Sequence, residues 1–156
     1  MSSARDNPPA VRRLGAAWLG LCLALGLHVA DEALSGFLSV YNPTVLAMRA
    51  RYAWFPMPVF GFTEWLTGLI ALIVVMFLLS PLFFQGVRWV RPIGWFMAVL
   101  NTFNALGHTA GTIAGRTVAS IHFPRPMPGF YSSPFLLAAS LYLLVQLART
   151  SRNGSA

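Results

Sequence analysis

The chain has 156 residues, of which 56% are hydrophobic and only 10% are charged. This length indicates a single domain, and a soluble domain of this size could not bury so much apolar surface. The formal net charge of +7 comes from eleven arginines against four acidic residues. Because these arginines are scattered between hydrophobic runs, the composition argues against nucleic-acid binding and predicts an integral membrane protein whose partner is the lipid bilayer.

Four segments are long enough to span a bilayer, which takes about 20 apolar residues. They cover residues 14–39, 62–84, 92–115 and 130–148. The sequence therefore predicts an all-α protein in which residues 1–156 form one transmembrane domain, a four-transmembrane-helix bundle. A signal peptide is the alternative for the first segment, but the polar residues after its apolar run make a poor cleavage site.

The first loop is expected to hold a short helix that lies on the membrane surface. Asn42 would cap this helix, and Pro43 would occupy its first turn. The arginines predict the orientation, because basic residues are enriched on the cytoplasmic side. Seven lie in the N-terminal segment, the second loop and the C-terminal segment, against four in the first and third loops. Both termini are therefore expected in the cytoplasm.

Three ionisable residues, His28, Asp31 and Glu32, lie inside the first predicted span. Each such residue costs about 2.5–3.5 kcal/mol on insertion scales, and such residues usually face the bundle interior. His28 and Glu32 are four residues apart, so their side chains share one helix face, and Asp31 flanks that face. A cluster this costly favours a functional site over a purely structural polar knot.

The third predicted span carries two stripes. The polar stripe consists of Asn101, Asn104, His108 and Thr112, and the small-residue stripe beside it consists of Gly107, Gly111 and Gly115. Small residues at this spacing let another helix approach closely, and we expect that helix to belong to the same chain. The pattern also allows a homo-oligomer.

The unusual residues are expected in one layer of the bundle. At about 1.5 Å per residue, Glu32 and His108 each lie roughly 10 Å from the outer ends of their predicted spans. Glu64 lies within about a turn of the outer end of the second span. Residues of three predicted helices thus lie at a similar depth, which predicts one site in the outer half of the membrane.

This residue set is compatible with two kinds of chemistry. The expected metal ligands are His28, Glu32, Glu64 and His108. A single zinc or iron ion with three protein ligands and an open position fits better than a di-iron centre, which needs two Glu-x-x-His motifs and two more glutamates. Without a metal, a buried histidine beside a buried acid can transfer protons. The sequence leaves both open.

The predicted function is an enzyme that acts on a lipophilic small molecule by hydrolysis, isomerisation or cyclisation. His28 and Glu32 would bind the ion or act as the acid/base pair. Asp31 and Glu64 would add ligands or orient the histidines. His108 and Asn104 would complete the coordination or polarise the substrate. A small transporter or carrier for a proton, metal ion or lipophile is the alternative, although four spans without an inverted repeat give no path through the membrane.

The same residues resemble the signature of the HXXEE family of small bacterial membrane proteins. That signature reads His28-Val29-Ala30-Asp31-Glu32 here, with aspartate as the first acid. The family's later elements are similar to Asn104-Ala105-Leu106-Gly107-His108 and to Pro128-Gly129-Phe130-Tyr131. The resemblance implies a bacterial inner-membrane protein with an uncharacterised enzymatic or metal site. The architecture more distantly resembles membrane sterol isomerases and sigma-2-receptor-like bundles, in which a histidine and acids surround a lipid-binding pocket.

Overall fold

The computed structural model describes residues 8–152, and 77% of the structure is helical. The helices are α1 (Pro8–Ser35), α2 (Leu38–Arg51), α3 (Phe62–Phe84), the 3-10 turn η2 (Arg88–Val90), α4 (Arg91–Ala114) and α5 (Ser133–Arg152). No β-strand occurs within these residues; Arg116 and His122 form one isolated antiparallel bridge. The expectation of an all-α protein is confirmed.

Three of the helices, α1, α3 and α5, are long and apolar enough to cross a membrane. On α3 many apolar side chains are exposed, and Leu78 is 72% exposed. An exposed apolar surface of this kind is typical of a face that contacts lipid. The fourth predicted span, α4, is a helix of similar length that carries the polar stripe, and it is not among the three, so the structure supports three of the four predicted spans.

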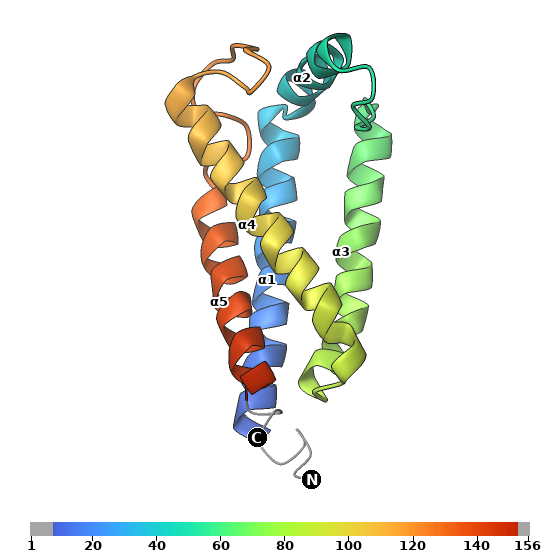
Figure 1. The fold of residues 1–156 in the computed structure, drawn as a ribbon, viewed down its shortest axis with the longest axis vertical. Coiled ribbons are helices and arrows are strands. Elements are labelled where there is room, and N and C mark those ends of the chain that lie inside the picture. The colour runs from blue at the N-terminus through green and yellow to red at the C-terminus, as the bar shows by residue number, and fades with distance from the viewer. Residues whose placement is uncertain (1–7, 153–156) are drawn as a thin grey trace.

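Helix α1 is the central element of the bundle. It packs against α3 on one side and α5 on the other, while α4 packs along α5 and crosses α1 only briefly. Figure 1 shows α4 as the tilted helix that crosses in front of α1, and α2 lying across the end of the bundle opposite the start of α1. The first turn of α1 and the last turn of α5 lie at the same end.

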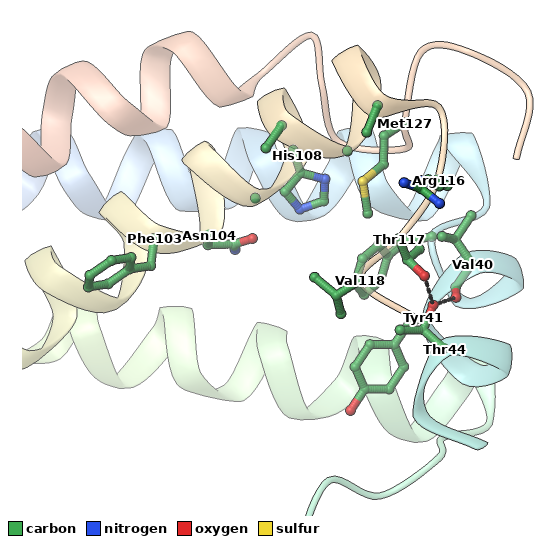
Figure 2. A pocket seen from close by; sticks show the side chains of 15 residues that line it. Val40, Tyr41, Thr44, Phe103, Asn104, His108, Arg116, Thr117, Val118 and Met127 are labelled. Carbon is green, nitrogen blue, oxygen red and sulfur yellow. Dashed lines mark hydrogen bonds between the residues drawn. The ribbon is translucent and has the colours of Figure 1, made fainter. Parts of the chain in front are cut away.

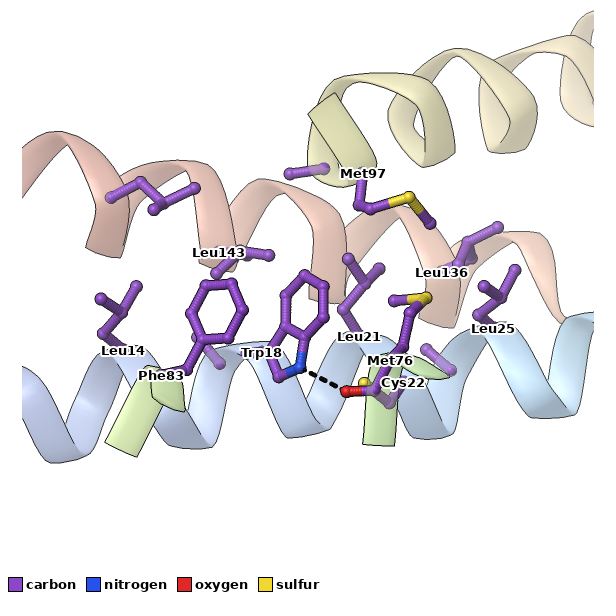
Figure 3. Close-up of a cluster of buried hydrophobic side chains, with 14 of the residues drawn as sticks. Leu14, Trp18, Leu21, Cys22, Leu25, Met76, Phe83, Met97, Leu136 and Leu143 are labelled. Carbon is purple, nitrogen blue, oxygen red and sulfur yellow. Dashed lines mark hydrogen bonds between the residues drawn. The ribbon is translucent and has the colours of Figure 1, made fainter. Parts of the chain in front are cut away.

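The two ends of the bundle differ in packing. At the α2 end a cavity of about 460 Å³ lies between α2 and α4 (Figure 2). Toward the opposite end the helices enclose a dense apolar core (Figure 3). There the Trp18 and Phe83 rings stack with centroids 4.0 Å apart, and Trp18 Nε1 donates a hydrogen bond to the carbonyl of Met76 at 2.9 Å. This core fixes α1 against α3 and α5, the frame on which the α2 end is built.

The boundary between the first span and the first loop differs from the prediction. Helix α1 ends at Ser35, not at residue 39, because Gly36 adopts a left-handed conformation with φ +77°. Helix α2 then begins at Leu38, so Asn42 is inside the helix rather than its cap. The Asn42 side chain instead exchanges two hydrogen bonds with the backbone of Phe60, at 2.9 and 3.1 Å. The predicted short helix is present, with a different start.

The glycine stripe of α4 does not admit another helix, contrary to the prediction. Gly107 has no neighbouring atom within 4 Å of the position a Cβ would take, and it lines the cavity. Gly111 is covered by the side chain of Met127, which comes from the segment between α4 and α5. The small residues therefore leave room for a cavity and a loop, and α4 meets α5 through other positions.

The proline-rich segment before α5 is compact rather than extended. It consists of turns and bends, and α5 begins at Ser133 instead of residue 130. Pro128 and Gly129 are buried, so this segment folds back into the bundle. Its return is what brings the chain before α5 against α1 and α4.

Candidate metal centre

The structure brings His28, Glu32 and His108 together. One potential ligand atom from each lies within 4.8 Å of the others, and all three side chains are buried. Glu32 Oε1 is 3.5 Å from His28 Nε2 and 3.1 Å from His108 Nε2. His28 and Glu32 share a face of α1, and α4 supplies the second histidine. This group, the His–Glu–His cluster, could hold a metal ion.

The orientation of His28 is fixed by a hydrogen-bonded chain that starts at Asp31. The Asp31 carboxylate accepts hydrogen bonds from the backbone N–H and the Oγ–H of Ser132, at 2.9 and 2.8 Å. Ser132 Oγ is also 2.8 Å from His28 Nδ1. Ser132 Oγ is also 3.1 Å from the Gly129 carbonyl, so its single hydroxyl hydrogen has two oxygen acceptors, and Nδ1–H of His28 is then the donor to Ser132 Oγ. Nε2 of His28 faces Glu32.

That arrangement leaves a deficit of positive charge at the centre of the cluster. His28 Nε2 and His108 Nδ1 are both buried and make no hydrogen bond within residues 8–152. A nitrogen lone pair that faces a carboxylate across 3.5 Å is unfavourable unless a proton or a cation lies between them. Tetrahedral zinc sites are built from this kind of donor set, with a carboxylate or carbonyl fixing the tautomer of each histidine.

The backbone of Gly129 lies directly against the cluster. Gly129 has φ +83°, and a Cβ at this position would come within 2.9 Å of both Glu32 Cγ and His108 Cε1. The buried hydroxyl of Ser133 donates to the Gly129 carbonyl at 2.7 Å and holds the turn in place. Only glycine fits here, both for its conformation and for its close approach to two of the three candidate ligands.

Two cavities adjoin the cluster. The α4 cavity, of about 460 Å³, has His108 in its wall (Figure 2). The α3 cavity, of about 400 Å³, has Glu32 in its wall and lies toward α3. Phe37, Tyr41 and Asn104 line both cavities. Molecules of ligand size can therefore reach the cluster from two sides, since typical ligand pockets measure about 300–1,000 Å³.

The remaining predicted site residues are near the cluster but outside it. Asp31 is connected to the cluster only indirectly, because it binds Ser132, which in turn contacts His28. Asn104 is partly buried, makes no hydrogen bond to a described residue and separates the two cavities. Glu64 is exposed; its carboxylate accepts a hydrogen bond from Gly61 N–H at 3.3 Å and so caps the start of α3. Glu64 is thus not part of the ligand group, although it lines the α3 cavity.

Two contributors were not identified as site residues from the sequence. Ser132 links Asp31 to His28, and Phe37 packs its ring 5.6 Å from that of His108. The signal for Ser132 was a Pro-Gly turn followed by two adjacent serines at the start of an apolar segment. No local pattern marks Phe37, because its position follows from the turn at Gly36.

Comparison with known proteins gives no relative for this chain. A scan of protein-family models finds no match, and neither the curated proteins nor the solved structures give one. The resemblance to the HXXEE proteins therefore depends on the quoted residues alone.

Proposed function

We propose that the protein is a membrane-embedded enzyme that binds one divalent metal ion at the His–Glu–His cluster and acts on a lipophilic substrate. The observation that carries this proposal is the direction of His28 Nε2. Asp31 and Ser132 hold this buried nitrogen toward the Glu32 carboxylate, and it makes no hydrogen bond to a described residue. Three protein ligands with an open fourth position are the arrangement of catalytic zinc sites.

The surroundings support an enzyme that takes its substrate from the bilayer. His108 and Glu32 belong to the walls of two different cavities, so a bound molecule can contact the cluster directly. A metal ion at such an open position supplies an activated water or polarises a carbonyl, and hydrolysis is the reaction class that this chemistry favours. Asn104, with its free amide between the cavities, is well situated to orient a polar group of the substrate.

The packed half of the bundle argues against the transporter alternative. Among the described residues, the only buried histidine or acidic side chains are those of the His–Glu–His cluster. The core around Trp18 and Phe83 is apolar. The buried polar side chains nearer the opposite end, such as Asn101, Ser140 and Gln146, are not ionisable, so among the described residues no buried proton-carrying group continues from the cluster. A site with its titratable groups gathered near the α2 end suits chemistry better than transport.

The test is the metal content of protein purified in detergent without chelator, measured by elemental mass spectrometry. We expect about one zinc or iron per chain in the wild type, as for a mononuclear site. His28→Gln, Glu32→Gln and His108→Gln should each lose the metal. Glu64→Gln should keep it, because the Glu64 side chain caps α3 outside the cluster.

The result also separates the two kinds of chemistry. If neither the wild type nor the zinc-supplemented protein contains metal, the metal proposal fails. The same buried nitrogen and carboxylate would then share a proton, and the site would be an acid/base pair. Loss of metal in Glu64→Gln to the same extent as in Glu32→Gln would contradict the ligand set.

A further inference from the structure

The α4 cavity has the shape of a site for one extended chain. Its α4 wall runs from Phe103 to Ala114, which is about 16 Å along the helix axis at 1.5 Å per residue. Its volume of about 460 Å³ corresponds to about fifteen groups of the size of a water molecule, each taking roughly 30 Å³ in the liquid. This is room for a single hydrocarbon chain and not for two.

The floor of the cavity is made by small residues of α4. These are Gly107, Ala110, Gly111 and Ala114. The cavity exists because they replace the larger side chains found elsewhere on the helix. His108 reaches the same cavity with its ring, and its buried Nδ1 has no partner among the described residues. A chain lying on the small residues would pass beside the cluster.

One end of the cavity is basic. Arg116 is the only side chain with a permanent charge in its lining, and within residues 8–152 it has no acidic partner. The guanidinium of Arg125 lies against Gly115, next to Arg116 in the chain. Two arginines that have no acidic partner among the described residues attract an anionic group. Arginine binds carboxylate and phosphate oxygens through paired hydrogen bonds.

We propose that the α4 cavity binds a single-chain anionic amphiphile such as a fatty acid. Its headgroup lies at Arg116, and its chain extends along α4 past His108. This inference names the substrate class and rests on the proposed function. From His108 to Ala114 alone the helix rises about 9 Å, so the group that reaches the cluster lies within the chain and not at the headgroup. A substrate for hydrolysis would therefore carry an ester or amide group within its chain, and a plain fatty acid would occupy the cavity as a ligand.

The test measures binding of radiolabelled palmitate to the full-length protein in phosphatidylcholine nanodiscs. Hexadecanol, which has the same chain and no charge, should bind on the order of tenfold more weakly, the effect of losing one charged hydrogen-bonding partner. Arg116→Gln should weaken palmitate binding by a similar factor and leave hexadecanol binding unchanged. Equal binding of palmitate and hexadecanol would refute the proposal that the cavity recognises an anionic headgroup.

Three glycines provide matched variants that test which cavity binds palmitate. Gly107, Gly68 and Gly20 all have open space where a Cβ would be added, so each backbone position accepts a side chain without a clash at Cβ. Gly107→Leu fills the α4 cavity, Gly68→Leu fills the α3 cavity, and Gly20→Leu fills neither. Palmitate binding should be lost only in Gly107→Leu. Binding that survives in Gly107→Leu, or competition by two-chain phosphatidylglycerol equal to that by palmitate, would overturn the proposal.

The metal content of the same samples keeps this inference separate from the proposed function. Gly107→Leu should retain its metal while losing palmitate, because the added side chain lies outside the ligand group. His28→Gln should lose metal while retaining palmitate. Metal without palmitate binding in the wild type refutes the ligand class alone, whereas palmitate binding without metal refutes the metal centre alone.

Discussion

Ser132 contributes no ligand atom to the cluster, yet its hydroxyl is the hydrogen-bond partner of His28 Nδ1. It stands between the Asp31 carboxylate and His28 Nδ1, 2.8 Å from each. A hydrogen-bond partner on the nitrogen that does not bind the metal orients a histidine ligand, and the loss of such a partner typically lowers metal affinity by about 10–100-fold. The adjacent Ser133 is equally buried but bonds only the carbonyl of Gly129.

These neighbours allow a matched test. Ser132→Ala should lower zinc affinity by about 10–100-fold, because His28 loses the partner that fixes its tautomer. Ser133→Ala should leave zinc affinity within a few-fold of the wild type, since its hydroxyl supports only the turn. Competition with a chromogenic chelator measures both. Equal losses in the two variants would mean that the serines act through the fold and not through His28.

Gly129 gives a second prediction at this scale. Gly129→Ala should abolish metal binding, because the added methyl group collides with Glu32 and His108 and the backbone has φ +83°. Gly86→Ala is the control: it has φ +69° at the other end of the bundle, where the atoms nearest to the added methyl group belong to Val11. Both should lower stability by about 1–2 kcal/mol from the left-handed conformation. If Gly129→Ala retained its metal, the Gly129 backbone would not lie as close to Glu32 and His108 as we infer.

Among the elements, α2 is attached to the segment that follows it by side-chain hydrogen bonds. Asn42 holds the backbone of Phe60 through both ends of its amide, and the Tyr41 hydroxyl donates to the Pro58 carbonyl at 2.9 Å. Tyr41 also lines both cavities. The segment between α2 and α3 therefore supports one wall of the site.

Asn42→Ala should loosen this wall. Two hydrogen bonds are lost, at about 0.5–1.5 kcal/mol each, so amide exchange in residues 52–61 should become faster. Tyr41→Phe removes a single bond and should accelerate the same amides less. Hydrogen-exchange mass spectrometry of the two variants provides the comparison. Unchanged exchange in Asn42→Ala would show that other contacts hold the segment.

The sequence located the cluster because intramembrane charge is expensive and helical spacing is simple. His28 and Glu32 had to share a face of one helix, and His108 was the ionisable member of the only comparable stripe. Glu64 was misjudged as a ligand because depth alone cannot distinguish an inward carboxylate from one that caps its own helix. The end of α1 at Ser35 depends on the left-handed Gly36, and a single glycine does not by itself mark the end of a helix in the sequence.

Tertiary arrangement was harder to foresee than the elements themselves. The Gly107, Gly111 and Gly115 spacing is compatible with a helix contact, a loop contact or a cavity, and the structure uses it for the last two. Likewise, the closeness of Ser132 to His28 is a contact across 104 residues. Such contacts arise from the fold of the proline-rich segment, which no local periodicity describes.

For the molecule as a whole, the transmembrane orientation can be tested with single cysteines. The only native cysteine, Cys22, is fully buried and should not react. Ala53→Cys, before α3, should be labelled by an impermeant maleimide from outside the cell. Gln85→Cys, after α3, should be labelled only after permeabilisation. Labelling of both from one side would refute a transmembrane α3, and the opposite pattern would reverse the orientation.

The contact between Ser132 and His28 also has a consequence for biosynthesis. Chains emerge from the ribosome at about 5–20 residues per second, so Ser132 is made roughly 5–20 s after His28. Until then His28 lacks the partner that orients it, and Glu32 lacks the turn that covers it. A chain synthesised only as far as His108 therefore holds all three candidate ligands but lacks both the partner of His28 and the turn at Gly129, and the surroundings of the cluster are complete only after Ser132 has been added.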